Sequence, residues 1–308
     1  MRSKLPEVEK LPEPERRDYY ARALEHCVTN KLVGLGWGID QLQSDTSLDD
    51  AARAVEGSYP RKGNLVRRFG ENAQIGDYVW HLDASGRYRL CRIDGPYRYD
   101  GSDQAKRVDC HHVRDVEWAR DNDPATPGLN DSAVPGGVIR AFGGGPGQEF
   151  VRIHDEAARR FTPHLWAKLH GEPLPKLEIT PREVLTKWLG PYEVEDLVYV
   201  WEQVAQGHVA LRSPPDTHVY EWTMIIREAQ RRCIVQVKSG ETPVDLEKLA
   251  EAADDETDTY AFATCGRYVG DPALVTKRIC VDELLQFVAQ HPDVLPSRVR
   301  HWFEWAAS

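Results

Sequence analysis

The chain has 308 residues and a formal net charge of −10, with 41% hydrophobic and 29% charged residues. This globular composition leaves room for two domains of ordinary size, and the acidic charge argues against a broadly basic, non-specific nucleic-acid binder. No apolar run approaches the roughly 20 residues of a membrane helix, the N-terminus lacks the apolar core of a signal peptide, and the six cysteines are scattered, so we expect a cytoplasmic protein with free thiols and no membrane partner.

The first half of the chain predicts a loose tail, one helix and a small β-barrel. Residues 1–15 are rich in Pro, Glu and Lys and are expected to form the tail, and residues 18–30 have helical spacing. A helical insert is expected over 48–69, with an interruption near Pro60. Short strand patterns separated by turn residues favour a barrel. These patterns are at 32–37, 76–82, 87–93 and 113–118, with Asp83–Gly86 as a hairpin turn between the second and third.

The second half of the chain predicts alternating helices and strands behind a linker. Residues 150–170 have a helical pattern, the linker is assigned to 161–180 with Pro173 and Pro175 at its centre, and Thr180 is a helix N-cap followed by Pro181. The remaining elements predict a mixed sheet flanked by helices. We expect helices at 193–206, 244–253, 282–290 and 297–305, and strands at 208–212, 219–226, 233–238 and 259–265.

The strand pattern at 233–238 carries two polar side chains on one face. Because side chains alternate between the faces of a strand, Gln236 and Lys238 share a face with Ile234. An amide and an ammonium on an apolar strand cost free energy unless they bind something charged. The preceding strand pattern holds one carboxylate, Glu221. If the two strands pair, these polar side chains can converge at one edge of the sheet.

An acid, an amide oxygen and a lysine on adjacent strands suit metal-assisted hydrolysis of a phosphodiester. Mg²⁺ prefers oxygen ligands and keeps several waters. We therefore expect Glu221, the amide oxygen of Gln236 and the backbone carbonyl of Val237 to bind Mg²⁺, with Lys238 holding the attacking water or a phosphate oxygen. The alternative is that Gln236 and Lys238 are ordinary residues at a sheet edge, with the lysine reaching out to solvent.

These residues resemble the PD-(D/E)xK nuclease superfamily, specifically its Mrr-like restriction branch, over residues 181 to about 290. That branch carries an acid on the second strand and Gln-x-Lys on the third, followed by a helix and a strand. The resemblance implies an extra ligand from the first core helix, for which Glu195 is the candidate. It also implies an aspartate where this chain has Glu221, so Asp216 in the preceding loop remains an alternative acid.

The first half of the chain carries a series of aromatic residues. Tyr78 and Trp80 lie on one face of their strand pattern. Aromatic walls suit the stacking of an extruded base, because every base has a π-face. The alternative is that these aromatics fill the core. The candidates for a modified-base pocket are Trp37, Tyr78, Trp80, Tyr97 and Trp118.

Residues 30 to about 155 resemble the PUA-like fold, close to the EVE domains found on restriction proteins. The resemblance rests on the order of short motifs rather than on any one of them. The motifs are Gly34–Trp37, Phe69, Gly76-Asp77, Gly95-Pro96-Tyr97 and Val116-Glu117-Trp118. It implies recognition of a modified base by flipping it into an aromatic cage.

Together the patterns predict an α/β and α+β two-domain protein: a PUA-like β-barrel reader with helices at 16–160 and a restriction-endonuclease-like mixed sheet flanked by helices at 181–308. The expected function is a Mg²⁺-dependent, modification-dependent DNA endonuclease that defends against phage or foreign DNA. Because two cuts in a duplex need two active sites, a homodimer or higher oligomer is expected. The alternatives are an RNA-binding PUA-like protein with an RNA-directed nuclease, and a non-catalytic reader that keeps the nuclease fold as a scaffold.

Overall fold

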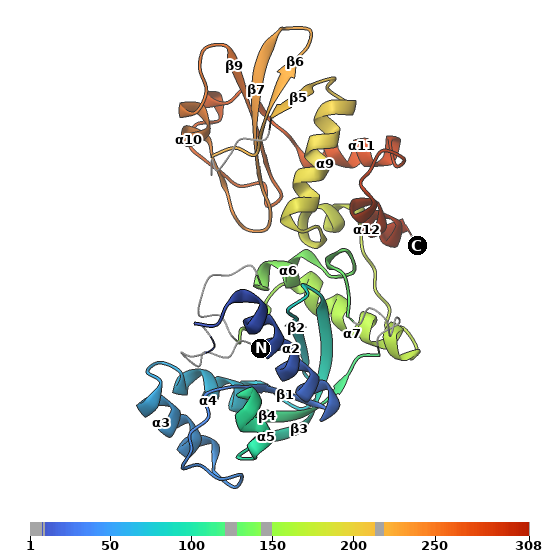
Figure 1. The fold of residues 1–308 in the computed structure, drawn as a ribbon. Helices are drawn as coiled ribbons and strands as arrows, with labels where there is room; N and C mark the ends of the chain where they lie inside the picture. Colours follow the sequence, from blue (N-terminus) through green and yellow to red (C-terminus); the bar gives the residue numbers. More distant parts are fainter. Residues whose placement is uncertain (1–7, 9, 121–127, 143–149, 213–218, 308) are drawn as a thin grey trace. The chain divides into compact units, whose positions relative to one another are not determined.

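The computed structural model describes residue 8 and residues 10–120, 128–142, 150–212 and 219–307 (Figure 1). The chain divides into two compact units. Unit 1 comprises Met1–Val134, Ala141–His154 and Arg159–Lys176, and unit 2 comprises Pro135–Arg140, Asp155–Ala158 and Leu177–Ser308. The last segment of unit 1 therefore ends inside the predicted linker, while two short segments before it belong to unit 2.

Unit 1 is built on a curled, four-stranded antiparallel sheet (Figure 1). Its strands, in spatial order, are β1 (Leu32–Leu35), β4 (His112–Trp118), β3 (Tyr88–Tyr99) and β2 (Tyr78–Leu82). The four predicted strands are confirmed, and of the predicted barrel the described residues form a curled half. Among the described strands, β1 and β2 each have one neighbour, so the sheet forms half of a barrel.

Strand β3 is longer than predicted because a bulge lets it continue past a proline. Its register with β4 shifts between Ile93 and Tyr97, around Pro96. Proline has no backbone N–H to donate to a ladder, so within a sheet it occurs at edges and bulges. The predicted strand ends at residue 93 because of this proline. In the structure, pairing resumes beyond the bulge, where Tyr97 pairs with Arg114 and Tyr99 with His112 of β4.

Within its described residues, unit 1 draws on five helices in addition to α6 (Gly136–Phe142). The predicted insert is confirmed as two helices separated around Pro60, and Ser47 caps the first through its side chain and the N–H of Asp50. The tail predicted for residues 1–15 is wrong at its end, because a helix begins at Glu13 after Pro12. The helices are α2 (Glu13–Thr29), α3 (Leu48–Ser58), α4 (Gly63–Asn72), α5 (Asp103–Val108) and α7 (Glu156–His170).

Helix α7 corrects the predicted linker. Residues 161–170, the first part of the assigned linker, are helical, and Phe161, Leu165 and Trp166 are buried. Burial of these large apolar side chains stabilises the last turns of the helix, and the non-helical stretch begins only after Gly171. Helix α6 (Gly136–Phe142) and a short 3₁₀ turn, Asp131–Ala133, precede it in the chain.

Unit 2 contains a five-stranded mixed sheet. Thr180 caps its first helical turn through a capping box with Glu183, as the N-cap pattern predicts. The sheet order is β11 (Lys277–Arg278), β9 (Thr257–Ala263), β7 (Arg231–Lys238), β6 (Trp222–Ile226) and β5 (Val209–Arg212). Strands β5, β6 and β7 pair antiparallel, and β7, β9 and β11 pair parallel.

Helices cover both faces of this sheet. Helix α9 places Tyr199 against Trp222, whose partner across the ladder is Val235. Helix α10 places Leu246 and Leu249 in a buried cluster with Ile234, which lies on the opposite face of β7. The helices of unit 2 are α8 (Pro181–Glu183) with the π-helical turn Val184–Trp188, α9 (Pro191–Val204), α10 (Leu246–Glu251), α11 (Val281–Gln290) and α12 (Ser297–Ala307).

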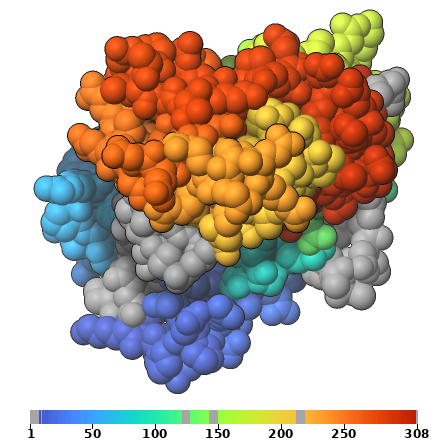
Figure 2. All heavy atoms as spheres, turned by 90° about the horizontal axis from the view of Figure 1, so that it is seen from above, coloured from blue at the N-terminus to red at the C-terminus, as the bar shows by residue number. Residues whose placement is uncertain are grey.

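Further short elements complete unit 2. Strands β8 (Val244–Asp245) and β10 (Tyr268–Val269) form a parallel pair, and a 3₁₀ turn spans Pro272–Leu274. Figure 2 shows a surface of unit 2 on which the C-terminal segments, in orange and red, adjoin the residues around α9 and β5, in yellow. In the described part of the chain, no helix combines the length and the apolar character that crossing a membrane requires.

Candidate active site

Glu221 lies at the end of β6 that adjoins the C-terminal end of β7. It immediately precedes β6, whose first residue, Trp222, pairs with Val235. The N–H of Glu221 donates to the carbonyl of the same Val235 over 2.9 Å, so two successive residues face one residue of β7, as in a bulge. This geometry brings Glu221 to the end of β7 that carries Gln236 and Lys238.

The carboxylate of Glu221 binds a backbone N–H of β7 at a position beyond the end of β6. Its Oε2 accepts the N–H of Val237 over 2.9 Å, and its Oε1 accepts a hydrogen bond from Nζ of Lys238 over 3.0 Å. The N–H and C=O groups of Val235 and Val237 point toward the same side of β7, because alternate residues of a strand direct their hydrogen-bonding groups to the same side. The carbonyl of Val237 therefore points to the side of β7 on which Glu221 lies.

Gln236 carries the feature that singles out this site. The side chain is 4% exposed, and its Oε1 is buried without a hydrogen-bond partner among the described residues. A buried amide oxygen that accepts nothing costs about 1–3 kcal/mol. Such an atom, on the same strand as Lys238, is suited to binding a cation that the chain alone does not provide.

Two glutamates shape the electrostatics of the site. Burial raises the pKa of Glu221 above its ordinary value, and the charge of Lys238 and the N–H of Val237 oppose that shift. Burial, followed by the charge of Glu221, raises the pKa of Glu195 to about 7, again opposed by Lys238. Glu195 on α9 therefore lies close enough to both residues to interact with them electrostatically, as expected for the extra acid.

The donor set fits a hard cation of the Mg²⁺ class. Glu221, Gln236 and the carbonyl of Val237 offer carboxylate, amide and backbone oxygens, which Mg²⁺ and Ca²⁺ prefer. Across the described ranges no group of three or more His, Cys, Asp or Glu residues is arranged to hold a metal ion. The acids that interact here are Glu221 and Glu195, and the amide of Gln236 and the carbonyl of Val237 are the oxygens that β7 adds. Asp216, the alternative acid, lies outside the described residues.

One residue near this site carries no signal in the sequence. Arg140 donates to Asp155 over 3.0 Å and to the carbonyl of Leu189 over 3.4 Å. A Cβ at Gly240, two residues after Lys238, would lie 3.3 Å from Nε of Arg140. The guanidinium therefore lies beside the turn that follows β7. Only the tertiary structure places it there, because Arg140 comes from a segment far from β7 in the sequence.

The five aromatics predicted for a base pocket occupy separate places in unit 1. Trp37 is 2% exposed and belongs to a core cluster with Val55, Val66 and Phe69. Trp118 packs against a different cluster and donates from Nε1 to the carbonyl of Cys27 over 3.3 Å. Both residues therefore serve the core, the role that was the alternative in the sequence.

The other three aromatics are held by partners of their own. The ring of Tyr78 lies 5.6 Å from that of Trp166. Trp80 donates from Nε1 to the hydroxyl of Thr162 over 3.1 Å, and the hydroxyl of Tyr97 is 2.8 Å from Nδ1 of His112. The structure does not bring the five side chains together into one cage.

A cavity in unit 1 lies elsewhere and none of these five aromatics lines it. Its volume is about 400 Å³, within the range of ligand sites, roughly 300–1,000 Å³. Its lining residues are Gly38, Ile39, Asp40, Gln41, Ser58, Tyr59, Lys106, Asp109 and His111.

Comparison with known proteins gives one match, in unit 1. A family model described as a domain of unknown function (DUF8426) matches residues 16–131. These residues run from α2 through β4 and contain all four strands of the curled sheet. No curated protein and no solved structure matches the chain. The match assigns no activity, so the arguments for function rest on the residues themselves.

Proposed function

We propose that this protein is a modification-dependent DNA endonuclease in which unit 2 hydrolyses the phosphodiester with Mg²⁺ and unit 1 reads a modified base. The observations that carry the nuclease are the contact between Glu221 and Lys238 and the buried, unpartnered amide oxygen of Gln236 on the same strand as Lys238. Antiphage defence in the cytoplasm, by a homodimer or higher oligomer, is part of the same proposal, because a double-strand break needs two active sites.

The proposed metal ligands are Glu221, the amide oxygen of Gln236 and the carbonyl of Val237, with Glu195 nearby. A divalent cation bound there supplies stabilisation of charge on the phosphate and lowers the pKa of a water. The polar atom of Gln236 then gains a partner, which removes the cost of leaving it unsatisfied.

Lys238 and Glu195 have roles that follow from their charges. The ammonium of Lys238 lies 3.0 Å from Glu221 and is placed to hold a phosphate oxygen or the attacking water. The carboxylate of Glu195 has a pKa near 7, so close to neutral pH it can accept a proton from water. Arg140, beside the turn after β7, supplies a further positive charge for a phosphate.

The reader role rests on two properties of unit 1. The order of motifs between Gly34 and Trp118 is similar to that of PUA-like domains, and the unit contains a cavity of about 400 Å³. A cavity of this size suits an extruded base, which a base-reading protein must hold outside the duplex.

A panel of matched plasmids tests the whole proposal. The full chain is incubated with Mg²⁺ and plasmids that carry or lack cytosine or adenine modifications, beside a structured RNA. Cutting of modified DNA alone supports the proposal. Equal cutting of unmodified DNA would contradict the reader role. Cutting of RNA alone would show that the substrate is RNA rather than DNA. Binding of modified DNA without any cutting would favour a non-catalytic reader.

A further inference from the structure

The turn after β1 is pressed against the segment between α5 and β4. A Cβ at Gly36 would lie 2.3 Å from Oδ2 of Asp109, and a Cβ at Gly38 would lie 2.1 Å from Nε2 of His111. Neither glycine can carry a side chain unless these groups move. Between them, Trp37 has φ 66°, and Asp109 has φ 46°. Non-glycine residues in this conformation are strained and are often found where structure serves a site.

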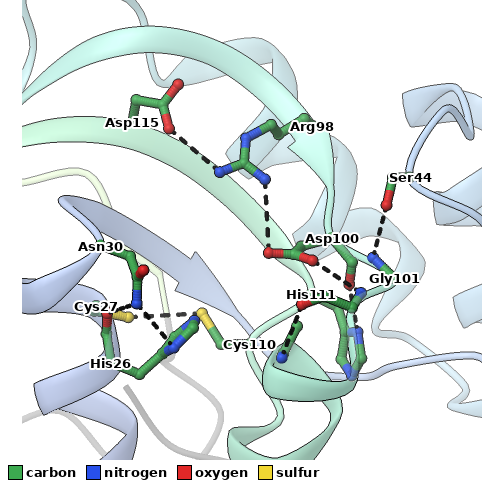
Figure 3. Close-up of polar contacts among 12 residues, drawn as sticks. His26, Cys27, Asn30, Ser44, Arg98, Asp100, Gly101, Cys110, His111 and Asp115 are labelled. Carbon is green, nitrogen blue, oxygen red and sulfur yellow. Dashed lines mark hydrogen bonds and ion pairs between the residues drawn. The ribbon is translucent and has the colours of Figure 1, made fainter.

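Two buried polar side chains lie in this packing, those of Asp109 and His111, and Oδ1 of Asp109 accepts the N–H of Gly38 over 3.3 Å. Nδ1 of His111 lies 2.8 Å from the carbonyl oxygen of Asp100 (Figure 3). A carbonyl only accepts, so Nδ1 carries the proton and Nε2 of the neutral ring is an acceptor. Oδ1 of Asp109 lies 4.0 Å from that Nε2, and the two side chains are 2% and 5% exposed for Asp109 and His111.

The backbone around His111 holds the imidazole in this orientation. The N–H of Asp100 donates to the carbonyl of His111 over 2.6 Å. Asp100 is therefore the donor in this bond and the acceptor in the bond from the imidazole. Arg98 lies 3.6 Å from the Asp100 carboxylate and 3.3 Å from Asp115 (Figure 3). The ring of Tyr99 stacks on that of His111 at 5.6 Å. The acceptor is therefore positioned before any ligand arrives.

The rest of the cavity adds an aromatic ring and a cation. Tyr59 lines the cavity together with Asp40 and Asp109, and burial, then the charges of these two carboxylates, raise the pKa of its hydroxyl. Lys106 also lines the cavity, and its side chain is 47% exposed. Two carboxylates against one ammonium disfavour an anion inside, so a phosphate group would stay outside, near Lys106.

A metal ion is a poorer occupant than a hydrogen-bond donor. Across the described residues no group of three or more His, Cys, Asp or Glu side chains is arranged to hold a metal ion. An amino group next to a ring can instead donate toward both Asp109 and His111 while the ring stacks on Tyr59. Aromatic stacking and carboxylate acceptance of an amino group are features of base recognition.

We propose that this cavity binds a nucleobase through its exocyclic amino group, with Asp109 and His111 as acceptors and Tyr59 as the stacking surface. The proposal rests on the reader role of unit 1. Such a cavity would select cytosine-type and adenine-type bases over thymine, because thymine carries a carbonyl oxygen where cytosine carries its amino group. It also replaces the aromatic cage expected from the sequence with a polar pocket.

The test measures binding of the full chain, in EDTA, to short single-stranded oligonucleotides with one central base. The bases are cytosine, 5-methylcytosine, adenine and N6-methyladenine, and the matched controls are 2-pyrimidinone and purine, which lack the amino group. Removal of the amino group from the preferred base should weaken binding about tenfold, the loss of one hydrogen bond to a charged acceptor.

Variants assign that effect to the cavity. Asp109→Asn keeps the size and tolerates positive φ, and it should lose the discrimination for the amino group. Tyr59→Ala should weaken binding of every base about tenfold, and Lys106→Ala should weaken all oligonucleotides equally. Arg107→Ala, on the same helix but outside the lining, is the matched control and should bind as the parent does.

The outcomes separate this inference from the reader role. If the chain prefers modified plasmids and both Asp109→Asn and Tyr59→Ala retain that preference and the amino discrimination, the cavity is not the reading site and the reader role stands. If the parent chain shows no preference among plasmids, the reader role fails and the inference fails with it. Loss of discrimination in a folded Asp109→Asn variant supports both.

Discussion

Nζ of Lys238 lies 3.0 Å from Oε1 of Glu221, and both side chains are largely removed from solvent, with 28% and 17% of their surfaces exposed. The pair joins the ends of β6 and β7. Each charge of this ion pair lowers the cost of burying the other. In the proposed nuclease the pair would also present opposite charges to a phosphate and its cation.

Replacement of Lys238 by alanine should abolish DNA cutting and leave binding of modified DNA intact. The carboxylate of Glu221 then loses its nearest compensating charge, so the metal-free protein should lose about 1–2 kcal/mol of unfolding free energy. Urea unfolding and plasmid cleavage measure the two effects. Lys248→Ala breaks an exposed pair with Asp245 at 3.1 Å and is the control, with a change within about 0.5 kcal/mol. Retained cutting in Lys238→Ala would remove this lysine from the mechanism.

The acid of the metal site can be assigned by comparing two variants. Glu221 accepts hydrogen bonds from Val237 and Lys238, so Glu221→Gln should lose both Ca²⁺ binding and Mg²⁺-dependent cutting. Asp216→Asn should retain both. Calorimetric titration with Ca²⁺ and plasmid cleavage measure the difference. Loss of Ca²⁺ binding in Asp216→Asn, with binding retained in Glu221→Gln, would reverse the assignment.

The geometry of the candidate site was predictable where it depends on local alternation. The period of two in β7 predicted that Gln236 and Lys238 share a face, and the pairing of β6 with β7 brings Glu221 to Lys238. Arg140 was not predictable, because its position beside Gly240 depends on contacts between segments distant in sequence. The two-residue strands β10 and β11 were missed, because so short a pattern carries no periodicity.

The curled sheet of unit 1 shows the same limit. Its strands were predictable from their patterns, but not whether the sheet closes. An aromatic residue that alternates along a strand looks the same whether it packs in a core or faces a ligand, and Trp37 proved to be core. The polar cavity depends on the docking of residues 36–38 against residues 109–111, a pairing that no local pattern encodes.

The contribution of Glu195 to the stability of the metal-free protein should fall as the pH rises from about 4.5 to about 7. Burial and the charge of Glu221 raise the pKa of Glu195 from 4.5 to about 7. In that window the unfolded chain has released the proton that the folded chain still binds, so rising pH favours unfolding. The effect is absent below the lower value and complete above the higher one.

Urea unfolding in EDTA across this pH window measures the contribution of Glu195. Glu195→Gln removes the titrating group, so its stability should rise relative to the parent as the pH increases through the window. Glu251→Gln changes an exposed residue on α10 and should follow the parent curve. Parallel curves for Glu195→Gln and the parent would contradict the assigned environment of this carboxyl group.

Two glycine substitutions test whether the turn after β1 holds the proposed base cavity in place. A Cβ at Gly38 would lie 2.1 Å from Nε2 of His111, whereas a Cβ at Gly57 in α3 meets nothing within 4 Å. Gly38→Ala should therefore cost about 1–3 kcal/mol of unfolding free energy by overpacking. Gly57→Ala should gain up to about 1 kcal/mol, because alanine is the better helix former.

Binding separates the two variants further. In Gly38→Ala the imidazole of His111 has to move away from its acceptor position, so the preference for an amino-bearing base should decrease even where the protein is folded. Gly57→Ala should bind the oligonucleotides as the parent chain does. A folded Gly38→Ala variant with unchanged stability and unchanged preference would show that the close approach of this turn to His111 is not required by the cavity.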